Sequence, residues 1–201
     1  MATSLTLEND SSLAQGYLKV NGSTAATLTT SGITGNLTGN VTGSLTAGGS
    51  LTLATAQTAS GTSVDFTGIP SWAKRITVMF SGVSTNGSSN PLIQIGAGSF
   101  VTSGYLGSSV DGPTLTGTLF TTGFGLRVST SSAVIYGNLA ITTLGSNFWS
   151  CSGNLTRSDS AVFVSTAGGV TLSGALDRIR ITTVNGTDTF DAGTINISYE
   201  G

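Results

Sequence analysis

The sequence between residues 33 and 48 repeats every four residues, and this repeat strongly limits what the chain can fold into. It reads Ile33-Thr-Gly-Asn, Leu37-Thr-Gly-Asn, Val41-Thr-Gly-Ser and Leu45-Thr-Ala-Gly, inside an uncharged stretch from residue 20 to 64. In an α-helix each glycine would cost up to about 1 kcal/mol, and the β-branched residues would add to that cost. A flat strand would leave a glycine without a side chain two positions from each apolar residue. We therefore expect neither regular structure here.

The arrangement that remains is an extended chain that turns at each Gly-Asn and presents one narrow apolar row. Its members are Ile33, Leu37, Val41 and Leu45. One such row cannot bury itself, whereas three identical chains around a common axis can, because the row then faces inward on every chain. We predict a thin trimeric shaft over residues 21–56 with this row as its interface. A disordered Gly/Ser/Thr linker is the alternative that composition allows.

Apolar and polar residues alternate over short spans after Gln57, as they do in half-buried strands. Strong helix formers such as Lys, Glu, Gln and Arg are scarce. The chain is therefore predicted to be all-β, with residues 1–20 as an N-terminal segment and residues 57–201 as a β-sandwich or jelly-roll head. The alternating sets are Ile76, Val78 and Phe80; Ile93 and Ile95; Val162 and Val164; Ile179 and Ile181; and Ile195, Ile197 and Tyr199.

Five glycine-containing pairs are interpreted as the turns between these strands, at spacings typical of a sandwich. They are Asn86-Gly87, Asp111-Gly112, Gly137-Asn138, Gly168-Gly169 and Asn185-Gly186.

The charge and residue content excludes several functions. The chain has a net charge of −2, only 8% charged residues and no basic run. It therefore offers no basic surface to the phosphates of a nucleic acid. It contains no stretch of roughly 20 apolar residues and no secretory leader pattern at its start, so we expect synthesis in a cytoplasm and no membrane insertion. Without histidine and with one cysteine, Cys151, the chain cannot form a Ser-His-Asp or Cys-His catalytic arrangement or a zinc site built on Cys/His clusters. We expect no enzyme activity and no cofactor, with Cys151 as a small buried apolar residue.

Two groups of charged residues could still form a site. Asp188 and Asp191 are interpreted first as acceptors for backbone N–H groups of a turn, with calcium binding and glycoside hydrolysis as alternatives. Arg178 and Arg180 are predicted to share a strand face opposite Ile179. They are expected on a solvated face, or in contact with aspartates of a neighbouring subunit.

Three segments together resemble the fibre proteins of tailed bacteriophages, of the short tail fibre or head fibre type. They are SGITGNLTGNVTGSLT, VDFTGIPSWAKRITVMFSGVS and the ending LDRIRITTVNGTDTFDAGTINISYE. The resemblance implies a homotrimeric virion protein with a jelly-roll-like C-terminal head, attached to the particle through its N-terminal segment. In such proteins the exposed head often binds host surface glycans or proteins.

The leading expectation is a fibre or spike on the virion surface that mediates host attachment. Because only 15 to 20 residues precede the predicted shaft, the N-terminal segment is expected to attach to a tail, adaptor or capsid protein as an extended peptide. A capsid decoration protein is the first alternative, and a glycan-cleaving tailspike is the second.

Overall fold

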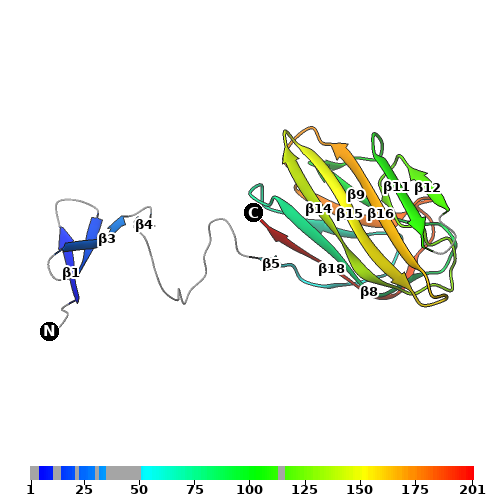
Figure 1. The fold of residues 1–201 in the computed structure, drawn as a ribbon, viewed down its shortest axis with the longest axis horizontal. Coiled ribbons are helices and arrows are strands. Elements are labelled where there is room, and N and C mark those ends of the chain that lie inside the picture. The colour runs from blue at the N-terminus through cyan, green and yellow to red at the C-terminus, as the bar shows by residue number, and fades with distance from the viewer. Residues whose placement is uncertain (1–4, 11–14, 21–22, 30–31, 35–50, 113–115) are drawn as a thin grey trace. The chain divides into compact units, whose positions relative to one another are not determined.

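The computed structural model describes residues 5–10, 15–20, 23–29, 32–34, 51–112 and 116–201 (Figure 1). The chain divides into two compact units, Met1–Ser44 and Leu45–Gly201. Of the predicted shaft row, Leu37, Val41 and Leu45 lie outside the described residues. The shaft and its trimer interface therefore stay predictions.

The described part of the N-terminal unit is one antiparallel sheet in the order β1-β2-β3-β4. Residue Leu5 of β1 lies opposite Val20 of β2, and Leu28 of β3 lies opposite Ile33 of β4. The predicted attachment segment thus contains two strands that pair with each other, and Ile33 lies in the same sheet. The strands span Leu5–Asp10, Gln15–Val20, Ser23–Thr29 and Gly32–Thr34.

The C-terminal unit consists of two antiparallel sheets. The five-stranded sheet has the order β10-β9-β17-β7, with β13 also paired to β9. Its strands are β7 (Val64–Thr67), β9 (Pro91–Ala97), β10 (Ser99–Phe100), β13 (Phe124–Gly125) and β17 (Arg178–Thr183).

The nine-stranded sheet has the order β12-β11-β16-β15-β14-β8-β18-β5, with β6 also paired to β18. Figure 1 shows β14, β15 and β16 as long neighbouring strands of this sheet. The strands are β5 (Thr52–Leu53), β6 (Gln57–Thr58), β8 (Arg75–Thr85), β11 (Leu106–Asp111), β12 (Gly117–Phe120), β14 (Ile135–Gly145), β15 (Phe148–Arg157), β16 (Phe163–Thr171) and β18 (Phe190–Glu200).

One hydrophobic core lies between the two sheets, and alternation along the strands supplies it. From the five-stranded sheet come Ile93, Ile95, Ile179 and Ile181, each fully buried. From the nine-stranded sheet come Ile76, Val78, Leu139, Ile141, Ile195 and Ile197. The described residues form strands and connections without a helix, so the all-β prediction is confirmed.

The cysteine prediction is also confirmed. Cys151 is 2% exposed and belongs to this core. Burial raises the pKa of its thiol to about 12, so the side chain packs as a neutral apolar group.

Two of the five predicted turns are wrong, because their glycines lie inside strands. Gly168 and Gly169 belong to β16, where a Cβ on Gly168 would lie 2.7 Å from the Cα of Gly107 in β11. Gly137 and Asn138 belong to β14, where a Cβ on Gly137 would lie 2.6 Å from the Asn154 carbonyl. Here glycine permits close approach of neighbouring strands.

Candidate binding hollow on the five-stranded sheet

A hollow of about 380 Å³ lies over the outer face of the five-stranded sheet. Ile179 and Ile181 of β17 point into the core, so Arg180 and Thr182 point outward and line the hollow. Hydroxyl and amide side chains from well-separated segments make up most of the lining. The lining residues are Thr62, Ser63, Leu92, Gln94, Thr102, Thr122, Arg180, Thr182, Thr183, Val184, Asn185 and Gly186.

The floor of the hollow comes from β9 and β17, in which Arg180 lies opposite Gln94. The Gln94 Nε2 donates a hydrogen bond of 3.0 Å to the Thr122 carbonyl. The Thr182 hydroxyl donates one of 2.9 Å to the Thr62 carbonyl. Both bonds hold a wall segment against the floor, which fixes the shape of the hollow before any ligand arrives.

The segment from Ser99 to Val101 covers the outer face of β9 beside the hollow. A Cβ on Gly96 would lie 2.9 Å from the Phe100 Cα, so only glycine lets this segment lie so close. Tyr105 holds the segment in place from the core side. Its hydroxyl accepts a hydrogen bond from the Ile95 N–H at 2.9 Å and donates one to the Val101 carbonyl at 3.1 Å. Burial is the main cause that raises the pKa of Tyr105 to about 12, so the phenol stays neutral in this role.

Arg180 is held between an aromatic ring and a carboxylate. Its guanidinium carbon lies 4.2 Å from the centroid of the Phe100 ring, within cation–π range. Its Nε and Nη2 donate to the two carboxylate oxygens of Asp65 at 2.8 and 2.7 Å. The carboxylate raises the pKa of Arg180, so the side chain stays charged and its charge is balanced within the chain. The hollow therefore presents hydroxyls and amides with a neutralised cation.

Arg178 lies next to Arg180 on the same strand face, as the alternation predicts. It forms two hydrogen bonds with Asp177, at 2.7 and 3.0 Å, and lies 5.7 Å from the Phe100 centroid. These bonds lower the pKa of Asp177 and raise that of Arg178.

Asp188 holds the far wall of the hollow. Its carboxylate accepts bonds from the Ser89 N–H at 2.9 Å and from the Asn185 Nδ2 at 2.7 Å, and these bonds lower its pKa. A Cβ on Gly87 would overlap this carboxylate, so Gly87 leaves room for the Ser89 bond. The interpretation of Asp188 as a turn acceptor is confirmed, and its effect is to fix the Asn185 wall.

Asp191 lies in β18 and accepts a hydrogen bond from the side-chain hydroxyl of Ser84, so its interpretation as an acceptor for turn N–H groups is wrong. The four predicted polar residues thus contact groups of their own chain, and their contact with a neighbouring subunit stays a prediction. In the part of the chain that the structure describes, no three His, Cys, Asp or Glu side chains are grouped as a metal site requires.

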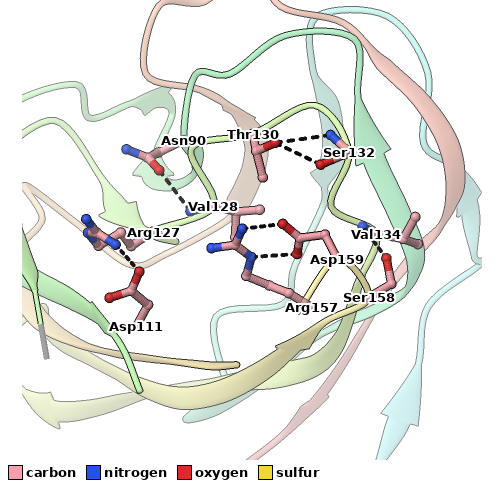
Figure 2. A network of polar contacts seen from close by, with 10 residues as sticks. All are labelled: Asn90, Asp111, Arg127, Val128, Thr130, Ser132, Val134, Arg157, Ser158 and Asp159. Carbon is pink, nitrogen blue, oxygen red and sulfur yellow. Dashed lines mark hydrogen bonds and ion pairs between the residues drawn. The ribbon is translucent and has the colours of Figure 1, made fainter. Parts of the chain in front are cut away.

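A second polar cluster joins loops at one end of the C-terminal unit (Figure 2). Arg157 donates to both oxygens of Asp159, at 3.0 and 2.6 Å, while Arg127 pairs with Asp111. The Asn90 Oδ1 accepts the Val128 N–H at 2.8 Å. Both arginines of this cluster are paired with carboxylates. We therefore interpret the cluster as a set of contacts that hold the loops together.

Comparisons with models of protein families, with curated proteins and with solved structures found no match to this chain. The resemblance to phage fibres therefore stays a prediction from the sequence. Among the described residues, no helix is long and apolar enough to cross a membrane.

Sequence reasoning found Arg180 and Asp188 but missed most of the hollow. Gln94, Thr102 and Thr122 are far apart in the sequence and lie in a chain where Ser and Thr are common. The one available signal was Phe100, an aromatic residue between turn-forming residues, which the structure places against both arginines.

Proposed function

We propose that this chain is a homotrimeric fibre or spike of a bacteriophage virion, and that its C-terminal unit binds a component of the host surface. The sequence resemblance supports the virion assignment, and the apolar residue at every fourth position from Ile33 to Leu45 supports the trimer. The all-β C-terminal unit is compatible with the sandwich or jelly-roll head that the resemblance implies.

The observation that carries the binding role is the chemistry of the hollow. Side-chain hydroxyls and amides converge on a pre-formed cavity whose arginine is balanced by Asp65. Such a lining offers hydrogen bonds to an uncharged polar ligand, and a saccharide of the host surface has that chemistry. Because the chain lacks histidine, binding without turnover is the simpler use of this site.

A binding assay with a blocked hollow tests this role. Thr102→Trp places a large ring in the hollow, and Thr67→Trp places the same ring on exposed β7 outside it. We expect the wild type and Thr67→Trp to bind whole cells or surface polysaccharide from a susceptible host, and Thr102→Trp to lose at least tenfold in affinity. Equal binding by all three proteins would remove the hollow from the proposal.

Gold labelling of purified particles with an antibody against the chain tests the virion assignment. Label at the tail supports the fibre, and label confined to the capsid would establish the capsid decoration role instead. Unlabelled particles would contradict both. New reducing ends on host polysaccharide, lost in Asp188→Asn, would establish the tailspike alternative.

A further inference from the structure

The outer face of the nine-stranded sheet consists of cross-strand rows of small, uncharged side chains. Strand pairing defines one row that crosses eight strands, with a leucine at each end. In order, its members are Leu119, Ser108, Ala167, Ser152, Ala140, Thr77, Ser198 and Leu53.

Three further rows run parallel to this one and have similar chemistry. The first is Gly117, Val110, Ser165, Asn154, Asn138, Met79 and Asn196. The second is Phe163, Thr156, Tyr136, Ser81, Thr194 and Thr58. The third is Leu106, Gly169, Ser150, Thr142, Arg75 and Glu200.

Charged residues are as sparse on these four rows as in the whole chain, of which 8% is charged. Their two charged members, Arg75 and Glu200, lie opposite each other at one corner, 3.3 Å apart at the nearest atoms. A contact through this face would therefore desolvate few ions.

Large apolar side chains are exposed on the same face. Leu106 and Leu119 are 75% and 70% exposed in the single chain, and Phe163 and Tyr136 are also exposed. Aromatic residues are enriched at protein interfaces, and apolar side chains that gather on one face indicate an interaction site.

The face is large enough for a stable contact. Rows about 6.7 Å apart along the strands, crossing six to eight strands about 4.8 Å apart, cover roughly 800 to 1,000 Å². A standard protein interface buries about 800 Å² on each partner.

We propose that this face, which we call the row face, faces the three-fold axis of the proposed homotrimer and packs against the other two copies of the chain. Contact between copies of this face can form without desolvating unpaired ions. The chain joins this sheet at β5, seven residues after Leu45, the last member of the predicted shaft row. Seven residues reach at most about 25 Å, so chains held together at Leu45 keep their row faces at high local concentration. The inference rests on the proposed homotrimer.

Oxidative footprinting of the purified full-length chain, read by mass spectrometry beside light scattering, tests this contact. Two leucines of the row face, Leu106 and Leu119, are the probes. We expect the oxidation rate of each in the assembled protein to be at least fivefold lower than the rate expected from its exposed area in a single chain. The internal reference is Val184, an exposed residue that follows β17, lines the hollow and lies outside the row face. A trimer in which both leucines react as fast as Val184 overturns this inference alone, and a monomer overturns the homotrimer as well.

A charge variant gives the second measurement. Ser152 and Ala167 are paired neighbours in the row that crosses eight strands. The double variant Ser152→Lys with Ala167→Lys places two cations on the row face. We expect the double variant to restore fast oxidation of Leu106 and Leu119. The matched control, Thr67→Lys with Ser160→Lys, changes the charge equally outside the row face and is expected to keep them protected. If Leu106 and Leu119 are still oxidised slowly in the row-face variant, the proposal is overturned. If the double variant does not fold, Ser108→Lys alone is used in its place.

Discussion

The two sheets of the C-terminal unit have similar inner faces and very different outer faces. Both point isoleucine and valine into one core. On its outer face, however, the five-stranded sheet carries Asp65, Arg178 and Arg180, a covering segment and a hollow. The nine-stranded sheet carries the row face. The comparison teaches that alternation determines which residues fill the core, whereas the opposite face of each strand is free to serve a different contact.

The covering segment gives the largest expected difference between the two faces. Gly96→Ala forces the Ser99–Phe100 backbone off β9, and we expect it to lower the free energy of unfolding by about 2 kcal/mol. Gly117→Ala in the edge strand β12 is the control, because its Cβ would meet nothing closer than 4.0 Å. We expect that change to stay within about 0.5 kcal/mol. Urea unfolding followed by tryptophan fluorescence measures both, and equal losses would break the comparison.

The ion pairs on the two outer faces give the next largest difference. Asp65→Asn removes one partner of a bidentate pair that is about one-third exposed, and we expect a loss of about 1 kcal/mol or less after solvent screening. Glu200→Gln removes the partner of Arg75, where both side chains are more exposed. That loss should be close to zero. A larger loss for Glu200→Gln in the same urea titration would contradict the assignment of electrostatic stabilisation to the five-stranded sheet.

Acid should weaken the charged regions of the C-terminal unit first. The bonds from Arg178 lower the pKa of Asp177, and those from Asn185 and Ser89 lower that of Asp188. Their contribution to stability is therefore present above the ordinary aspartate pKa and is lost as the pH falls through the lower folded values. We expect stability to decline below about pH 4. In Asp188→Asn the decline should be shallower, as thermal unfolding between pH 2 and 7 would show; an unchanged slope would exclude Asp188.

The smallest effect is expected on the row face itself. Ser152→Ala keeps a small uncharged side chain at an exposed position, so stability should change by less than about 0.5 kcal/mol and the assembled mass should not change. Thr182→Val is the matched removal of a hydroxyl on the other sheet. It leaves the Thr62 carbonyl without its donor and should cost about 1 kcal/mol. Equal costs would show that the hydroxyls of the two faces contribute alike.

Three strands with unbroken alternation were predicted from the sequence, whereas two long strands with a glycine in the alternating set were not. The sets at Ile76, Ile93 and Ile179 lie in β8, β9 and β17 as predicted. Strands β14 and β15 were missed. In each, a glycine replaces one inward residue, and the partner strand places a leucine opposite it: Gly137 faces Leu155, and Gly153 faces Leu139. At both glycines a Cβ would lie within 3 Å of the backbone of the partner strand, so glycine permits the close approach of β14 and β15. That requirement is a property of the pair and cannot be seen in either strand alone.

The candidate site was less predictable than the fold. Alternation correctly placed Arg178 and Arg180 on one face, but Asp65, the partner of Arg180, is 115 residues away in the sequence. Strand register brings them together, and one sequence without an observed pairing does not fix register. The hollow likewise depends on the Ser99–Phe100 segment lying over Gly96.

The mass of the purified full-length chain in solution tests the central claim most directly. Light scattering across a size-exclusion peak is predicted to give three times the chain mass of 20.1 kDa. A monodisperse species at the mass of one chain would contradict the predicted shaft, the packing of the row faces and the proposed fibre together.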